Sequence, residues 1–180
     1  MTNRIKICGV GSVLLGDDAV GPYAAHWIEA NYEFGEGVVV EDLGTPGLDL
    51  IAYMTGMDVL ILIDAVDNHE APGTVTVYDR AAITKHRPAA RMDAHSPIVT
   101  ESIFVAELAG EAPEHIYLAG VTIEQTEVDA PLSDSVMNAL PLLVETVLQK
   151  VTEHGGTFRK REMPLDPGIW WRNPAVGIAV

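Results

Sequence analysis

Residues 59–63 read Val-Leu-Ile-Leu-Ile and form the most apolar strand candidate in this chain of 180 residues. A strand that is apolar at every position is typical of the centre of a parallel sheet, where helices cover both faces. Asp64 follows the run directly. The stretch therefore predicts an α/β fold and places a carboxyl group at the end of a buried strand.

The segments on either side of this stretch alternate between strand and helix patterns. Short apolar runs predict strands, and apolar residues at helical spacing predict helices. The predicted strands are residues 5–10, 37–43, 59–63, 74–78 and 116–121, and the predicted helices are residues 20–32, 48–55, 96–109 and 133–153. This order predicts three layers, with a twisted, mostly parallel five-stranded sheet between helices on both faces.

Residues 74–78 differ from the other predicted strands. They follow a Pro72–Gly73 turn and alternate in hydrophobicity, which is typical of an edge strand. No helix separates them from the strand before, so we expect this strand to run antiparallel. Residues 79–95 are mostly polar and predict a loop. We expect residues 1–154 to form a single α/β domain and residues 155–180 a C-terminal tail or arm.

The amino-acid composition of the chain limits the kinds of molecule that it can bind and the compartment in which it works. The formal net charge is -15, which argues against nucleic acids and anionic membranes because both attract clustered Lys and Arg. Cys8 is the single cysteine, so an intrachain disulfide is excluded and a reducing compartment is favoured. Residues 1–6 lead into a strand pattern without a signal-like segment. We expect a cytoplasmic monomer.

Three polar side chains lie where predicted strands and helices are connected. Asp18 comes after the first strand, Asp64 after the third, and His95 immediately before a predicted helix. Ligands of open α/β sheets bind outside the carboxyl ends of the strands, so we expect these side chains to converge. Two carboxylates and one imidazole suit nickel, zinc or iron and leave coordination positions open.

Each of these residues also has a simpler interpretation. Asp18 could cap the first helix, and His95 could be an ordinary loop histidine. A carboxylate at the position of Asp64 is costly unless it is paired or metal-bound. Asp17 could orient a ligand or start a helix, and Glu41 and Asp42 could cap, pair or line a cleft.

Other chemistries are less well supported. Gly9, Gly11 and Gly16 only partly match a dinucleotide-binding fingerprint, because Leu14 occupies the third glycine position. Two loop carboxylates would also repel a pyrophosphate. Cys8 lies within the first predicted strand, where we expect it to face the core. The chain contains neither a G-x-S-x-G elbow nor an H-E-x-x-H pair.

Four segments together resemble the hydrogenase maturation endopeptidases, nickel-dependent proteases that trim the large subunit of [NiFe] hydrogenases. Residues 9–21, GVGSVLLGDDAVG, resemble the family's opening motif, and residues 42–45, DLGT, its D-x-G-T turn. Asp64 is similar to its strand-ending aspartate, and His95 to its histidine. The resemblance covers about residues 4–150. Ser12 departs from a common Asn, and Asp18 stands where some members have Glu.

The resemblance implies that Asp18, Asp64 and His95 are both the metal ligands and the catalytic residues. It implies an endopeptidase that removes the C-terminal extension of a [NiFe] hydrogenase large-subunit precursor after nickel insertion. Nickel would arrive with the precursor, and zinc or cadmium could replace it in crystals. An alternative is a non-proteolytic nickel-binding accessory protein. Because His95 must be neutral to bind metal, activity should fall below roughly pH 6.

Overall fold

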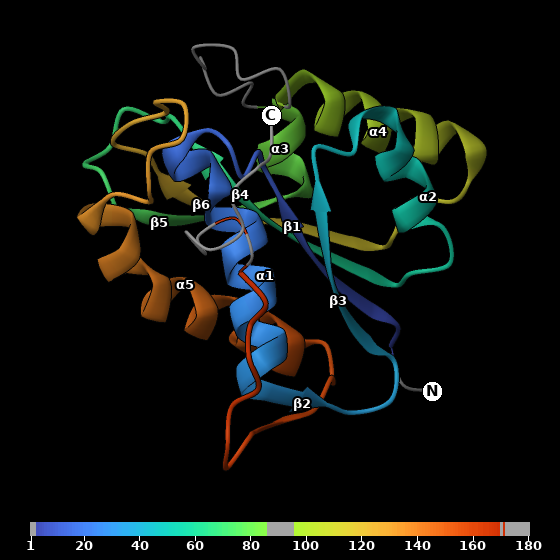
Figure 1. The fold of residues 1–180 in the computed structure, drawn as a ribbon. Coiled ribbons are helices and arrows are strands. Elements are labelled where there is room, and N and C mark those ends of the chain that lie inside the picture. The colour runs from blue at the N-terminus through green and yellow to red at the C-terminus, as the bar shows by residue number, and fades with distance from the viewer. Residues whose placement is uncertain (1–2, 86–95, 170, 172–180) are drawn as a thin grey trace.

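The computed structural model describes residues 3–85, 96–169 and 171. Its middle layer is a five-stranded sheet with the order β3-β1-β4-β6-β5 (Figure 1). Neighbouring strands run parallel except β5, which lies antiparallel to β6 at the edge. The strands are β1 (Ile5–Val10), β3 (Val38–Gly44), β4 (Val59–Val66), β5 (Val75–Asp79) and β6 (His115–Thr122). The predicted α/β class and the antiparallel edge strand are confirmed.

Helices cover both faces of the sheet and enclose two apolar clusters. The helices are α1 (Val20–Asn31), α2 (Leu50–Met54), α4 (Ser96–Ala109) and α5 (Asp134–Glu153). Alternate residues of β4 point to opposite faces: Ile61 and Ile63 pack with α1 and α5, and Leu60 and Leu62 with α2 and α4. Because β4 is buried along its whole length, its apolar sequence is explained by its central position.

Two boundaries differ from the sequence predictions. Strand β4 continues to Val66, so Asp64 lies inside the strand rather than after it. Part of the predicted 79–95 loop is the short helix α3 (Arg80–Lys85). The side chain of Asp79 accepts a hydrogen bond from the Ala82 backbone N–H at 2.8 Å and so satisfies a free donor of the first turn. Residues 86–95 lie outside the described part of the chain.

A second, two-stranded sheet joins distant parts of the chain. Strand β2 (Tyr32–Phe34) continues directly from α1 and pairs antiparallel with β7 (Phe158–Lys160). Beyond β7 the chain returns along α1, where the Leu165 N–H donates to the Ala30 carbonyl at 2.9 Å (Figure 1). Residues 158–165 therefore pack on the α/β domain. Among the helices described, none combines the length and apolar character needed to cross a bilayer.

Candidate active site

Glycines let the loop after β1 pack directly on the sheet. A Cβ atom on Gly9 would lie 2.3 Å from the Gly21 carbonyl oxygen, and one on Gly21 would lie 2.4 Å from the Ile63 carbonyl oxygen. Gly11 has a φ of +137°, and a Cβ atom there would lie 1.9 Å from the Asp18 carbonyl oxygen. These close approaches place the 3-10 helix η1 (Gly16–Ala19) against β4. Gly9 and Gly11, which partly match a nucleotide fingerprint, are thus required for packing.

Asp18 lies in η1 and is 5% exposed. One of its carboxylate oxygens accepts a hydrogen bond from the Ser12 backbone N–H at 2.6 Å. The N-cap position of α1 belongs to Ala19 and not to Asp18. The capping alternative for Asp18 is therefore wrong, and its carboxylate instead holds the glycine loop.

Asp64 is 9% exposed and accepts a hydrogen bond from its own neighbour, the Ala65 N–H, at 2.8 Å. Strand alternation turns its side chain to the face covered by α2 and α4, the face that Leu60 and Leu62 occupy. Gly120 of β6 lies opposite Asp64, and a Cβ atom there would lie 2.7 Å from Val66. The strand therefore holds this carboxylate within a closely packed region.

The structure brings Asp18 and Asp64 to the same edge of the sheet. Strands β1 and β4 are parallel neighbours in which Gly9 pairs with Ile63, and η1 packs on β4. The predicted third member, His95, lies outside the described residues, although α4 begins at the next residue. Within residues 3–85, 96–169 and 171, no group of three or more His, Cys, Asp or Glu side chains could hold a metal ion.

Asp17, the neighbour of Asp18, is fully buried and holds a loop that the sequence did not connect to it. Its Oδ2 atom accepts from the Glu124 N–H at 2.8 Å, the Gln125 N–H at 3.1 Å and the Ser133 hydroxyl at 2.9 Å. Its Oδ1 atom accepts from the Ser133 N–H at 2.6 Å. Asp17 therefore joins η1 to the segment between β6 and α5.

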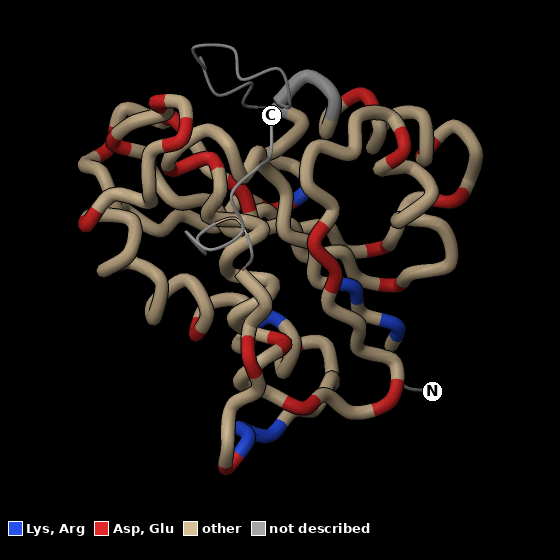
Figure 2. Tube along the Cα trace, viewed as in Figure 1, with Lys and Arg blue, Asp and Glu red and all other residues tan. Residues whose placement is uncertain are grey.

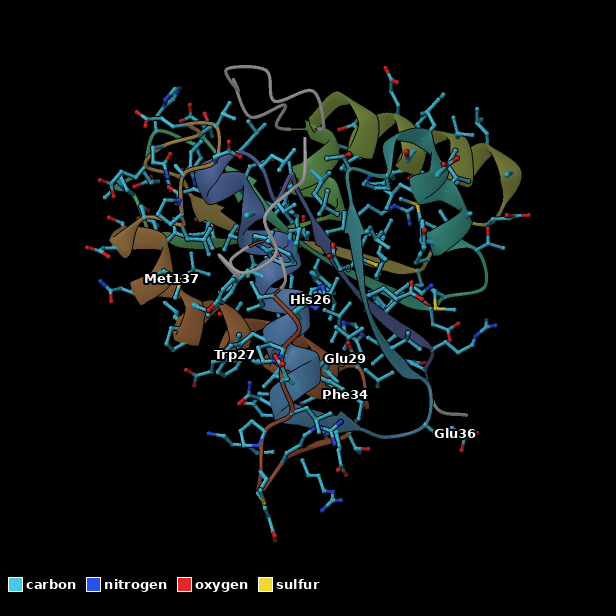
Figure 3. All side chains as sticks on the ribbon, viewed as in Figure 1. His26, Trp27, Glu29, Phe34, Glu36 and Met137 are labelled. Carbon is cyan, nitrogen blue, oxygen red and sulfur yellow. The ribbon has the colours of Figure 1, made fainter. Side chains whose placement is uncertain are left out.

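The D-x-G-T turn is also joined to a distant element. Asp42 accepts from the Gly44 N–H at 2.9 Å, and its second oxygen lies 3.1 Å from His26 Nε2. The other ring nitrogen of His26 lies 2.8 Å from the Pro167 carbonyl oxygen, and the Trp171 ring stands edge-on at 5.4 Å. Figure 3 shows His26 on α1 where the C-terminal segment crosses the helix. No local sequence pattern points to a role for His26, because its contacts depend on the tertiary fold.

Cys8 has no exposed surface, which confirms that it faces the core. Burial raises the pKa of its thiol to about 12, although the positive charge of Lys6 acts in the opposite direction. Lys6 forms an ion pair with Glu41 at 3.0 Å. Since the thiolate is the reactive form of cysteine, Cys8 is not a nucleophile near neutral pH.

Charge is unevenly distributed over the described surface. Most of the described Lys and Arg residues lie around β2, β7 and the start of β1, whereas Asp and Glu are spread over the whole molecule, including the strand ends near η1 (Figure 2). The basic group comprises Arg4, Lys6, Arg159, Lys160 and Arg161, and the acidic group includes Asp67, Glu70, Glu124, Glu127 and Asp129. The edge that carries Asp18 and Asp64 therefore favours cations and basic segments.

Comparison with known proteins gives a consistent result. A family model described as hydrogenase maturation protease matches residues 22–150. The hydrogenase 2 maturation protease of Escherichia coli is 30% identical over 163 residues, which are 88% of this chain and 97% of that protein. The hydrogenase expression/formation protein HupD of Bradyrhizobium diazoefficiens is 29% identical over 164 residues, which are 91% and 85% of the two chains.

A solved structure supports the same assignment. The hydrogenase maturating endopeptidase HybD from Escherichia coli matches with a TM-score of 0.80 and 28% sequence identity. The match covers 88% of this chain and 98% of that chain. The sheet order, the glycine loop with its buried aspartates and these similarities lead to one conclusion. The chain belongs to the hydrogenase maturation protease family.

Proposed function

We propose that this protease removes the C-terminal extension from the precursor of a [NiFe] hydrogenase large subunit after nickel has been inserted. The observation that carries the proposal is the pair of buried carboxylates, Asp18 and Asp64, at one sheet edge of a chain from this protease family. Buried carboxylates are costly unless charge or hydrogen bonds compensate them. Both carboxylates already accept backbone hydrogen bonds, and a cation brought by the substrate would stabilise their charge further.

In this proposal Asp18 and Asp64 contribute oxygen ligands and His95 contributes a nitrogen ligand. Such a set suits nickel, leaves positions for groups of the precursor, and would also accept zinc or cadmium in crystals. A divalent cation held by these three residues would supply Lewis-acid chemistry, for a peptide carbonyl or for a water molecule. Nickel would arrive as part of the substrate, because three protein ligands and open coordination positions favour weak binding of the metal by the protease alone.

The residues of the chain itself would position the reacting groups. The Ser12 N–H holds one oxygen of Asp18, and the Ala65 N–H holds one oxygen of Asp64. Both carboxylates therefore have a set orientation before the precursor arrives, which reduces the reorganisation needed for reaction. The low exposure of both side chains keeps water from competing for them.

The variants Asp64→Asn and His95→Ala test this assignment. We expect both variants to lose cleavage of a nickel-loaded large-subunit precursor, at least 100-fold in rate, because each change removes a ligand. Mass spectrometry of the precursor would measure the loss of its C-terminal peptide. Asp58→Asn is the matched control, because the Asp58 side chain is 40% exposed and adjoins the opposite end of β4.

The same measurement distinguishes a protease from a nickel-binding accessory protein that does not cleave the precursor. A C-terminal mass loss with the unmodified protein supports the protease, whereas nickel binding without any mass loss would support an accessory role. Normal cleavage by both variants would show that the metal-ligand proposal is wrong. We further propose that the protein is cytoplasmic, since its single cysteine is a buried free thiol. We also propose that it is a monomer, and light scattering of the purified protein would detect a dimer.

A further inference from the structure

We infer that two bridged loops beside Asp18 form a docking ledge for the C-terminal segment of the precursor. The ledge consists of residues 12–16, after β1, and residues 124–130, after β6. In Figure 1 the segment between β6 and α5 lies beside the start of α1, at the upper left. This inference rests on the proposed function, because it names the surface that receives the same substrate.

The two loops are bound to each other by their backbones. The Asp17 N–H donates to the Gln125 carbonyl at 3.1 Å, and the Asp129 N–H donates to the Leu14 carbonyl at 2.9 Å. Leu15 and Val128 form an isolated antiparallel bridge between these two bonds. The loops therefore behave as one short two-stranded unit rather than as independent segments.

Side-chain hydrogen bonds also stabilise this two-stranded unit. The buried Asp17 carboxylate accepts two hydrogen bonds from the start of the second loop, at Glu124 and Gln125, and two from Ser133, which follows the loop. The Gln125 side chain donates to the Pro131 carbonyl at 2.8 Å and accepts from the Glu127 N–H at 2.8 Å. A surface that is already ordered loses less conformational entropy when a partner binds.

Two apolar side chains stand exposed on this braced unit. Leu14 is 49% exposed and Val128 is 71% exposed. The bridge places Val128 opposite Leu15, the residue that follows Leu14 in the chain, so both exposed residues belong to the same bridged unit. Apolar side chains held on ordered loops beside an active site are suited to anchor an extended peptide.

Charge and position decide which occupant fits the ledge. Val128 lies between Glu127 and Asp129, which are both exposed, and the chain carries a net charge of -15. A second copy of this chain would therefore meet like charges. A segment with an apolar side chain next to a basic one is complementary. Leu14 lies just before η1, the element that carries Asp18, so a peptide held on the ledge would lie near the proposed site of cleavage.

The experiment compares Leu14→Ser and Val128→Ser with the control Leu142→Ser, whose side chain is 56% exposed on α5. Steady-state cleavage of the nickel-loaded precursor would be measured for each variant. We expect KM to rise about tenfold for each ledge variant while kcat stays within about twofold, because the ledge binds substrate without touching the reacting bond. Unchanged KM in both ledge variants would overturn the inference.

Hydrogen–deuterium exchange tests docking without requiring cleavage. Addition of the precursor should slow exchange in residues 12–16 and 124–130. Protection there without any cleavage would support the ledge and contradict the proposed function, so the two failures are distinguishable. Protection confined to the exposed face of α4, which carries Phe104, Val105 and Leu108, would overturn the ledge and place the precursor on that helix instead.

Discussion

At the scale of single residues, two consecutive aspartates have different roles. Asp18 is held by one loop N–H and lies at the edge shared with Asp64, whereas Asp17 uses both oxygens to hold the loop after β6. A carboxylate can accept several hydrogen bonds at once, and charge makes each of them stronger than a neutral bond. The pair therefore combines a candidate ligand with a residue that positions the surface around it.

Asp17→Asn tests this positioning role. The amide keeps the size of the side chain, but its NH₂ group would face N–H and O–H donors and cannot accept from them. We expect a loss of about 2–4 kcal/mol in the free energy of unfolding, because buried hydrogen bonds to a charge are replaced by unsatisfied donors. Urea denaturation would measure it.

Asp166→Asn is the matched control for this change, because Asp166 is exposed and accepts a local bond from the Gly168 N–H. Its effect should stay within about 0.5 kcal/mol. A stable Asp17→Asn protein with normal KM for the precursor would contradict both the anchoring role and its connection to the ledge.

At the scale of elements, the end of α5 packs on the start of β6 through a cluster of aromatic and histidine rings. The His154 Nε2 atom lies 3.0 Å from the Tyr117 hydroxyl, and the His115 ring lies 4.4 Å from the His154 ring. Burial lowers the pKa of His154, and a charge on His115 lowers it further, while Glu153 acts in the opposite direction. The contact between helix and strand therefore favours neutral His154.

This shift predicts a pH-dependent stability. Because the pKa of His154 is lower in the folded protein, the unfolded chain binds the proton more readily. Neutral His154 makes its full contribution to the free energy of unfolding at pH values above its unfolded pKa of about 6.5. This contribution decreases as the pH falls below that value toward the folded pKa. We expect His154→Gln to reduce the change in melting temperature between pH 7.5 and 5.5. An identical change in the unmodified protein and the variant would exclude this histidine as the cause.

At the scale of the whole molecule, the net charge of -15 is the dominant electrostatic property. Described ion pairs such as Arg161–Glu33, at 2.8 Å, and Arg80–Glu107, at 2.6 Å, neutralise only a few acidic groups. Repulsion between the remaining carboxylates opposes the compact state, and salt screens it.

We therefore expect the melting temperature at pH 7.5 to rise by a few degrees between about 20 and 200 mM NaCl. Differential scanning calorimetry would measure it, with sucrose at equal osmolality as a control for effects that are not electrostatic. A lower melting temperature in salt would show that attractive ion pairs outweigh the repulsion.

Much of the architecture followed from local patterns. The uniform apolarity of residues 59–63 predicted a central strand, and the turn before residues 74–78 predicted the antiparallel edge strand; both are confirmed. Short-range signals failed where tertiary contacts decide the structure. Strand β2 pairs with β7 across more than 100 residues. The position of His95 stays a prediction, because it lies outside the described residues.

The sequence by itself determined the class of fold and the candidate ligands Asp18 and Asp64, because hydrophobic periodicity and motif spacing are local properties of the chain. Only the tertiary structure decided what surrounds them: the depth of Asp64 within β4, the partners of Asp17 and the link between Asp42 and His26. These contacts join residues that are distant in sequence. They arise from the packing of whole elements, which no local pattern specifies.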